Sequence, residues 1–276
     1  MIRLIALDID GTLLDSGGVI PEANRRAIAR AIEAGIEIVL ATGRRFDFAR
    51  PIFEALPGPL TLILSNGAIV KTTSGRTLIR RLLPLPLARQ VLAAAPDHRD
   101  RAALIFDRPL AGQVVFERVD WDHPRHGRFF QANRPYITEI QPLEEALVED
   151  PVQVMFTGRC AEMRALFARL DGGGAYAVAL TEYLHRDFSL VDVVRAGCSK
   201  GTALRAWAER RGFGPEMVMA VGDNLNDLEM LEYAGSPVLM GNALPELKAR
   251  GWPVTGSNDE GGVSAAIETL ALGKAS

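Results

Sequence analysis

Residues 2–12, which read IRLIALDIDGT, decide how the rest of the chain is interpreted. Residues 2–7 are mostly apolar and predict a buried strand, and the carboxylates of Asp8 and Asp10 follow directly after it. A turn at Asp10-Gly11 is one explanation, because Asp-Gly pairs are common in turns. A metal site is the other, because two carboxylates at the end of a buried strand are costly without a counter-ion, and oxygen ligands suit Mg²⁺. This segment alone supports the two interpretations equally.

Apolar runs alternate with helical periodicity in the first third of the chain, and the same pattern returns in the last third. The alternation predicts an α/β fold with a Rossmann-like, doubly wound parallel-sheet core. Polar segments follow the predicted strands: Asp8-Ile9-Asp10, Thr42-Gly43-Arg44, Ser65-Asn66-Gly67 and Gly222-Asp223-Asn224-Leu225-Asn226-Asp227. Because ligands bind outside the carboxyl ends of the strands in open α/β sheets, we expect these segments to converge on one site.

The middle third of the chain has a different pattern. Strand-like runs flank one another there, with helical stretches between pairs, and this order predicts an α+β module with an antiparallel sheet. We therefore expect a domain of residues 83–189 that is inserted into a core made of residues 1–82 and 190–276.

Composition limits the classes of partner and compartment. A formal net charge of −3 provides no basic surface for nucleic acid or for an anionic membrane. The sequence contains no run of about 20 apolar residues that would span a bilayer. Two cysteines, Cys160 and Cys198, cannot form a disulfide scaffold, so we expect a reducing compartment, the cytoplasm. Composition leaves a monomer and a small homo-oligomer equally open.

Three further segments carry groups that suit an anionic ligand. Lys200 lies at a predicted helix start, where a cation opposes the helix dipole unless an anion is near, although a solvated lysine behind a Ser199 cap is an alternative. Thr42-Gly43-Arg44 offers a hydroxyl and backbone N–H groups for phosphate, although a simple N-cap has the same appearance. Residues 222–227 contain more carboxylates and amides than a turn needs, which favours a metal or ligand site.

Together these segments resemble the motifs of the haloacid dehalogenase-like hydrolase superfamily, in the same order and spacing. More narrowly, the chain resembles the Cof-type phosphatase branch. That narrower resemblance rests on Ser65-Asn66-Gly67-Ala68, Met240-Gly241-Asn242-Ala243 and Ser257-Asn258-Asp259-Glu260-Gly261-Gly262-Val263. It implies that the inserted residues 83–189 form an α/β cap domain.

The resemblance also implies a role for each residue of the site. Asp8 would attack phosphorus to form an aspartyl-phosphate, and Asp10 would protonate the leaving oxygen and then activate water. Mg²⁺ would be held by the carboxylates of Asp8 and Asp223 and by the backbone carbonyl of Asp10. The phosphate or substrate would be bound by Thr42, Gly43, Lys200 and Asn226. Supporting roles fall to Thr12, Arg44 and Asp227, the last of which would support either the metal or Lys200.

The function implied by the resemblance is Mg²⁺-dependent hydrolysis of a small phosphate ester, either a sugar phosphate or a similar phosphomonoester. Two alternatives stay open: a phosphotransferase or mutase of the same superfamily, and a non-catalytic protein that binds a phosphorylated metabolite. The sequence has no P-loop and no Gly-x-Gly-x-x-Gly after its first strand, which excludes the ordinary kinase and dehydrogenase interpretations.

His123 and His126 have a spacing that invites a zinc interpretation. A zinc site needs further ligands nearby, and none is evident in the sequence. We therefore interpret this segment as a solvated loop or, second, as a loop that reaches toward an anionic substrate.

Overall fold

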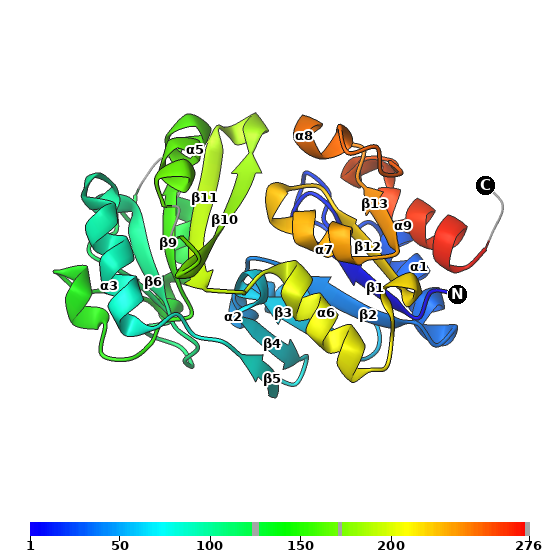
Figure 1. Ribbon diagram of the computed structural model, residues 1–276, viewed down its shortest axis with the longest axis horizontal. Coiled ribbons are helices and arrows are strands. Elements are labelled where there is room, and N and C mark those ends of the chain that lie inside the picture. Colours follow the sequence, from blue (N-terminus) through cyan, green and yellow to red (C-terminus); the bar gives the residue numbers. More distant parts are fainter. Residues whose placement is uncertain (123–126, 171–172, 274–276) are drawn as a thin grey trace. The chain divides into compact units, whose positions relative to one another are not determined.

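The computed structural model describes residues 1–122, 127–170 and 173–273 of the chain. The chain divides into two units, one of Met1–Arg80 with Cys198–Ser276 (unit 1) and one of Arg81–Gly197 (unit 2) (Figure 1). His123 and His126, whose segment we interpreted from the sequence as a loop, lie outside the described residues.

Unit 1 is built on a seven-stranded sheet with the order β13-β12-β1-β2-β3-β4-β5. Its strands are β1 (Leu4–Leu7), β2 (Glu37–Ala41), β3 (Leu60–Leu64), β4 (Ile69–Thr72), β5 (Thr77–Arg80), β12 (Val218–Gly222) and β13 (Ser236–Leu239). The strands from β13 to β3 are parallel, and β4 and β5 add an antiparallel edge. The α/β fold class with a parallel-sheet core is thereby confirmed.

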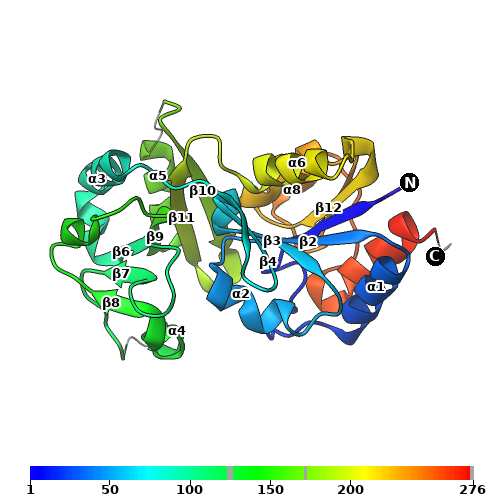
Figure 2. The ribbon, with the colours of Figure 1, turned by 90° about the horizontal axis from the view of Figure 1, so that it is seen from below.

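Helices cover both faces of this sheet. They are α1 (Glu22–Glu33), α2 (Phe46–Phe53), α6 (Lys200–Arg210), α7 (Leu228–Tyr233), α8 (Pro245–Lys248) and α9 (Gly262–Ala266). α6 and α1 lie on opposite faces of the sheet (Figure 2). α7 packs against α6, and α9 packs against α1. β1 is consequently buried on both sides along its whole length, which explains why its sequence, LIAL, is continuously apolar and not alternating.

Unit 2 contains a six-stranded sheet with the order β10-β11-β9-β6-β7-β8. Its strands are β6 (Ala102–Ile105), β7 (Val114–Phe116), β8 (Ile137–Glu139), β9 (Gln153–Gly158), β10 (Tyr176–Tyr183) and β11 (Phe188–Arg195), and its helices are α3 (Leu85–Ala94), α4 (Gly127–Asn133) and α5 (Cys160–Arg169). All neighbours in this sheet are antiparallel except β7 and β8. α3 and α5 lie on one side of the sheet and α4 on the other (Figure 2).

The boundary between the insertion and the returning core differs from the one expected. The sequence suggested that the core resumes at residue 190, but unit 2 continues to Gly197. The reason is the length of β11, which pairs with β10 from Phe188 as far as Arg195. A strand that is hydrogen-bonded along its whole length belongs to the sheet that holds it.

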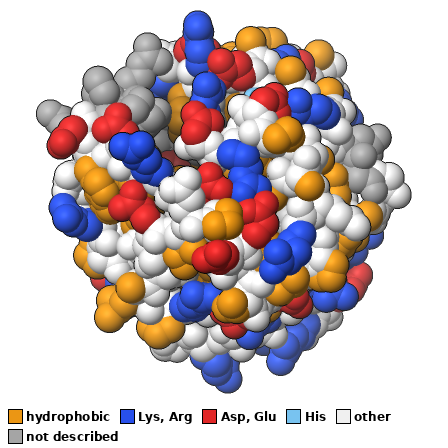
Figure 3. Space-filling view, turned by 90° about the vertical axis from the view of Figure 1, so that its left-hand side faces the viewer, with side chains coloured by type: hydrophobic (Ala, Val, Ile, Leu, Met, Phe, Trp, Pro, Cys, Tyr) orange, Lys and Arg blue, Asp and Glu red, His pale blue; other side chains and the backbone are white. Residues whose placement is uncertain are grey.

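The surface of unit 2 is of mixed polarity. On the face drawn in Figure 3, Lys and Arg side chains alternate with Asp and Glu, and hydrophobic side chains are scattered among them. Several of the charges in unit 2 are paired, as in Arg108–Glu149 and Arg169–Asp97, both at 2.7 Å. No helix in the described part of the chain is both long enough and apolar enough to cross a membrane.

The packing of the unit 1 core predicts how much a truncated core side chain lowers the free energy of unfolding. Leu4 is fully buried in a cluster that also contains Leu204 of α6 and Val218 of β12. Leu4→Ala should therefore lower the free energy of unfolding by about 2–5 kcal/mol, because it removes apolar contacts and leaves a cavity. Urea denaturation followed by tryptophan fluorescence measures this. Val19→Ala, at a valine that is 62% exposed, is the control and should change stability by less than about 0.5 kcal/mol. Equal effects would contradict the assignment of Leu4 to the core.

Candidate active site

Three polar segments meet at one edge of the unit 1 sheet. β12, β1 and β2 are adjacent and parallel, so their carboxyl ends lie side by side. Asp223 follows β12, Asp8 follows β1 and Thr42 follows β2. The convergence expected from the strand ends is therefore what the sheet order produces.

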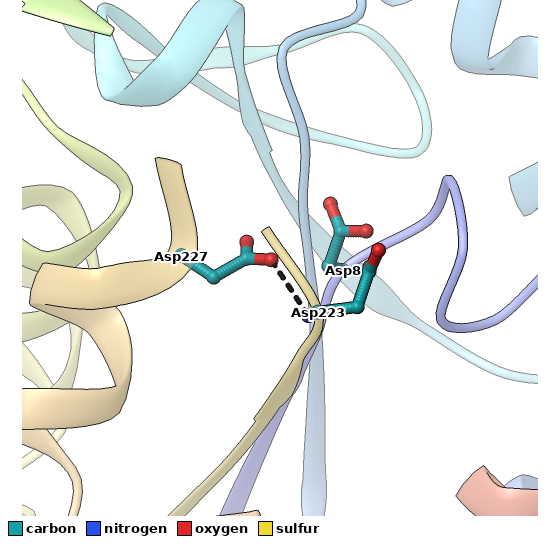
Figure 4. A group of neighbouring side chains, drawn as sticks. All are labelled: Asp8, Asp223 and Asp227. Carbon is teal, nitrogen blue, oxygen red and sulfur yellow. Dashed lines mark hydrogen bonds between the residues drawn. The ribbon is translucent and has the colours of Figure 1, made fainter. Parts of the chain in front are cut away.

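The closest group of ionisable side chains consists of Asp8, Asp223 and Asp227 (Figure 4). One carboxylate oxygen from each lies within 4.8 Å of the others. Asp8 is 4% exposed, Asp223 7% and Asp227 0%, so the negative charges of the group are almost completely removed from water. Such crowding is unfavourable unless cations compensate it.

Lys200 supplies one compensating charge from the first turn of α6. Its Nζ donates to Asp8 Oδ1 at 2.6 Å and to Asp227 Oδ1 at 2.7 Å, and its side chain is fully buried. The sequence suggested that an anion explains a lysine at this helix start. The structure shows that two carboxylates of the chain itself lie within contact distance, so the alternative of a solvated lysine is wrong.

Asp227 uses both of its oxygens for internal contacts. Oδ1 accepts from Lys200, and Oδ2 accepts from the backbone N–H groups of Asp223 and Asn224 at 3.0 Å each. The dashed line in Figure 4 marks the contact with Asp223. Asp227 therefore fixes the turn after β12 and holds Lys200 in place.

Asp223 is held from the segment after β1. Thr12 Oγ1 donates to Asp223 Oδ1 at 2.8 Å. Gly11, at φ +87°, lies so close that a Cβ on it would come within 2.5 Å of Asp223 Oδ2. Glycine is required at this position for both its backbone conformation and its lack of a side chain.

Burial and mutual repulsion raise the pKa values of the Asp8 and Asp223 carboxyl groups. Burial raises the pKa of Asp8 from 3.8 to about 7, and the charge of Asp227 adds to the effect. Burial likewise raises the pKa of Asp223, with further contributions from Asp8 and Asp227. Burial opposes the charge of Lys200, but Asp227 and Asp8 outweigh it and keep the pKa of the ammonium raised.

The charge balance fits a divalent cation. Three buried carboxylates face one buried ammonium, which leaves an excess of negative charge when all are ionised. Hard oxygen ligands are the donors that Mg²⁺ prefers. Asp227 already uses both oxygens, so the carboxylates available to a cation are those of Asp8 and Asp223.

Thr42 and Asn226 occupy the same edge of the sheet but contact other residues. Thr42 is 1% exposed, and its Oγ1 accepts from the backbone N–H of Arg44 at 3.1 Å. Asn226 Nδ2 donates to Asn66 Oδ1 at 3.0 Å. Asn66 also lies against Gly43, where a Cβ would come within 3.3 Å of its amide. Asn66 thereby connects the segments after β2, β3 and β12.

Two residues that the sequence did not assign to the site help to build it. Asn66 adopts a left-handed conformation, with φ 50° and ψ 37°, in the turn after β3. Asn242 Nδ2 donates to the backbone carbonyl of Gly11 at 2.7 Å and so holds the segment after β1. Both residues lie in motifs that carried the Cof-type resemblance, which was the available signal.

Asp10 is separate from the buried acidic group. Its carboxylate forms a two-pronged ion pair with Arg44, with distances of 2.8 Å from Nε to Oδ2 and 2.6 Å from Nη2 to Oδ1. Its side chain is 25% exposed. The two aspartates of the opening motif therefore have different surroundings: Asp8 contacts a buried lysine, and Asp10 contacts a partly exposed arginine.

Comparisons with known proteins agree on one family. A family model described as haloacid dehalogenase-like hydrolase matches residues 5–267. Pyridoxal phosphate phosphatase YbhA of Escherichia coli (strain K12) is 32% identical over 264 residues, which cover 93% of this chain and 94% of the relative. The phosphatase YwtE of Bacillus subtilis (strain 168), named for 5-amino-6-(5-phospho-D-ribitylamino)uracil, is 27% identical over 301 residues and covers 99% of each chain.

Solved structures show the same fold. The structure of a haloacid dehalogenase-like hydrolase from B. subtilis matches with a TM-score of 0.82 and 25% sequence identity. The match covers 98% of this chain and 100% of the other.

The raised pKa values predict how a metal affects stability. The Asp8 carboxyl group, whose pKa is raised in the folded protein, stabilises the fold fully below pH 3.8, and this stabilisation is lost as the pH rises through about 7. Mg²⁺ requires the ionised carboxylates, so its stabilising effect should increase over the same range. We expect saturating Mg²⁺ to raise the melting temperature by about 5 °C or more at pH 8 and by little at pH 5.

Differential scanning fluorimetry with and without Mg²⁺ measures this difference. Asp223→Asn should abolish the rise at pH 8. An equal rise at both pH values would contradict the prediction that these carboxylates bind the metal.

The buried ammonium predicts a second stability effect. Lys200→Met keeps the volume of the side chain but leaves Asp8 and Asp227 without their cation. Breaking a buried ion pair from one side costs about 3–5 kcal/mol, so urea denaturation in the absence of metal should show a loss of that size. Lys248→Met, at an exposed lysine, should cost about 1 kcal/mol or less. A Lys200 variant as stable as the Lys248 variant would rule out the buried charge cluster.

Proposed function

Because the chain belongs to the haloacid dehalogenase-like hydrolases and is a phosphatase of that family, we propose that it hydrolyses a small phosphomonoester through an aspartyl-phosphate on Asp8. The observation that carries this proposal is the position of Asp8. It follows a buried strand and lies beside Asp223, and its Oδ1 is 2.6 Å from Nζ of the buried Lys200. This arrangement keeps a carboxylate oriented and close to positive charge, as an attacking group on a phosphate ester requires.

The first step would be attack of an Asp8 oxygen on phosphorus. The bond from phosphorus to the substrate oxygen breaks, and Asp10 gives its proton to that leaving oxygen. Lys200 would balance the charge that develops on the phosphoryl oxygens, and Thr42 and Asn226 would hold those oxygens.

The second step would release phosphate. Asp10, now ionised, takes a proton from water, and the water oxygen attacks phosphorus. The bond between phosphorus and Asp8 breaks, which restores the carboxylate of Asp8. Mg²⁺, held by the carboxylates of Asp8 and Asp223 and the backbone carbonyl of Asp10, would neutralise charge on the phosphoryl group when bound.

The proposed substrate is a phosphorylated metabolite of low molecular weight. The two relatives described above are named for pyridoxal phosphate and for a phosphoribitylamino-uracil, both small phosphate monoesters. A sugar phosphate belongs to the same chemical class. The cytoplasm is the proposed compartment, since the two cysteines of the chain, Cys160 and Cys198, are too few for a disulfide scaffold.

Replacement of the nucleophile tests the proposal. Purified protein with Mg²⁺ should release phosphate from p-nitrophenyl phosphate and from members of a phosphometabolite panel. Asp8→Asn keeps the shape of the side chain but removes its nucleophilic charge, so the rate should fall by about 10⁴-fold or more. Asp100→Asn, at an aspartate whose side chain is 74% exposed in unit 2, is the matched control and should retain full activity.

Two further measurements separate the alternatives. Beryllium fluoride should add to Asp8 in the wild type and not in Asp8→Asn. A non-catalytic binding protein would show neither this addition nor any turnover by the wild type. Added alcohols should not divert the phosphoryl group from water, whereas a phosphotransferase would form a new ester. Full activity of Asp8→Asn would refute the proposed nucleophile.

A further inference from the structure

The ion pair between Arg44 and Asp10 has a geometry that fixes a carboxylate in one orientation. Arg44 Nε donates to Oδ2 at 2.8 Å and Nη2 donates to Oδ1 at 2.6 Å, so each oxygen of Asp10 has its own donor. A planar guanidinium that binds both oxygens restricts rotation of the carboxylate, which a single contact does not. The exposed fractions of the two side chains are 18% and 25%, so the pair is mostly shielded from water.

Arg44 is itself held in place. Its backbone N–H donates to Thr42 Oγ1 at 3.1 Å, and its backbone carbonyl accepts from Ser65 N at 3.1 Å. Its guanidinium carbon lies 4.3 Å from the ring centroid of Phe48, and Nη1 lies 3.4 Å from the Phe48 carbonyl oxygen. Because these contacts hold the Arg44 side chain in one position, they also fix the position of the carboxylate that its guanidinium binds.

The backbone around Asp10 is fixed from the opposite end of the chain. Asn242 Nδ2 donates to the carbonyl of Gly11 at 2.7 Å, and Asn258 Nδ2 donates to the carbonyl of Leu14 at 2.9 Å. Asn242 Oδ1 in turn accepts from the backbone N–H of Asn258 at 2.9 Å. These amides immobilise the main chain of the segment, but the Asp10 carboxylate depends on Arg44 for its orientation.

We propose that Arg44 is a positioning residue that orients the Asp10 carboxylate toward the leaving oxygen. This inference rests on the proposed function, in which Asp10 moves protons. It gives Arg44 no contact with the phosphoryl group; Arg44 acts through Asp10 alone.

If Arg44 acts through Asp10, the effect of removing Arg44 depends on the leaving group. An alkoxide leaves poorly and needs a proton, whereas p-nitrophenolate leaves without one. The ratio kcat/KM reports the steps up to the departure of the leaving group, and so excludes the later attack of water, which is common to both substrates. Loss of a correctly placed proton donor costs about 10²–10⁴-fold.

The experiment compares kcat/KM for an alkyl phosphate and for p-nitrophenyl phosphate in the intact protein. Arg44→Met should lower kcat/KM at least about 30-fold for the alkyl phosphate and less than about threefold for the aryl phosphate. Arg44→Lys keeps the charge but cannot bind both oxygens, so it should show the same selective loss if the orientation matters and not the charge. Melting temperatures of both variants verify that they fold.

Arg50→Met is the matched control. Arg50 lies on α2, pairs with Asp47 at 2.9 Å and stacks over Phe46 at 5.0 Å, but its side chain is 47% exposed. Like Arg44, Arg50 pairs with an aspartate and lies over a phenylalanine ring, but its aspartate partner is Asp47 and not Asp10, so Arg50→Met should leave both rates unchanged.

A double variant tests whether Arg44 acts through Asp10. In an Asp10→Asn background, Arg44→Met should cause no further loss with the alkyl phosphate, because the group that it positions is already absent. Equal losses for both substrates, or independent losses in the double variant, would overturn the inference and indicate direct binding of substrate by Arg44. Absence of turnover by the wild type would instead overturn the proposed function, and this inference with it.

Discussion

The burial of one ammonium among carboxylates is the constraint on which the site depends. Lys200 has no exposed surface, and both of its carboxylate partners, Asp8 and Asp227, are nearly or fully buried. Removing such charges from water is expensive, and their attraction compensates the cost only when the geometry is good. The order β12-β1-β2 supplies that geometry, because it places the residues after three parallel strands at one edge of the sheet.

The contacts of Asp227 show how the free-energy cost of burying these charges is limited. It gives one oxygen to Lys200 and the other to two backbone N–H groups, so none of its charge is left without a donor. The negative charges of Asp8 and Asp223 are less fully balanced by hydrogen-bond donors and positive charge, and the pKa values of both carboxyl groups are therefore raised. The residues that a metal would bind are therefore those that the protein leaves incompletely balanced.

Local sequence patterns predicted the parts of the fold that local physics controls. The continuously apolar strand before Asp8 and the polar segment after β12 were both recognisable, because burial and turn chemistry have short-range signatures. The contact between Asn242 and Gly11 joins residues 231 positions apart and has no such signature. The left-handed conformation of Asn66 is set by its surroundings, and the end of unit 2 depended on how far β11 pairs with β10. The partnership of Arg44 with Asp10 could not be read from the sequence for the same reason.

The burial of Lys200 also determines how the chain reacts with reagents in solution. The sequence contains only the lysines Lys71, Lys200, Lys248 and Lys274. An acylating reagent needs a neutral, accessible amine, and Lys200 is enclosed and kept protonated by its two carboxylate partners. Its amine becomes reactive only when α6 separates from the carboxyl ends of the strands that carry these partners. Acylation of Lys200 therefore reports local opening at the centre of unit 1.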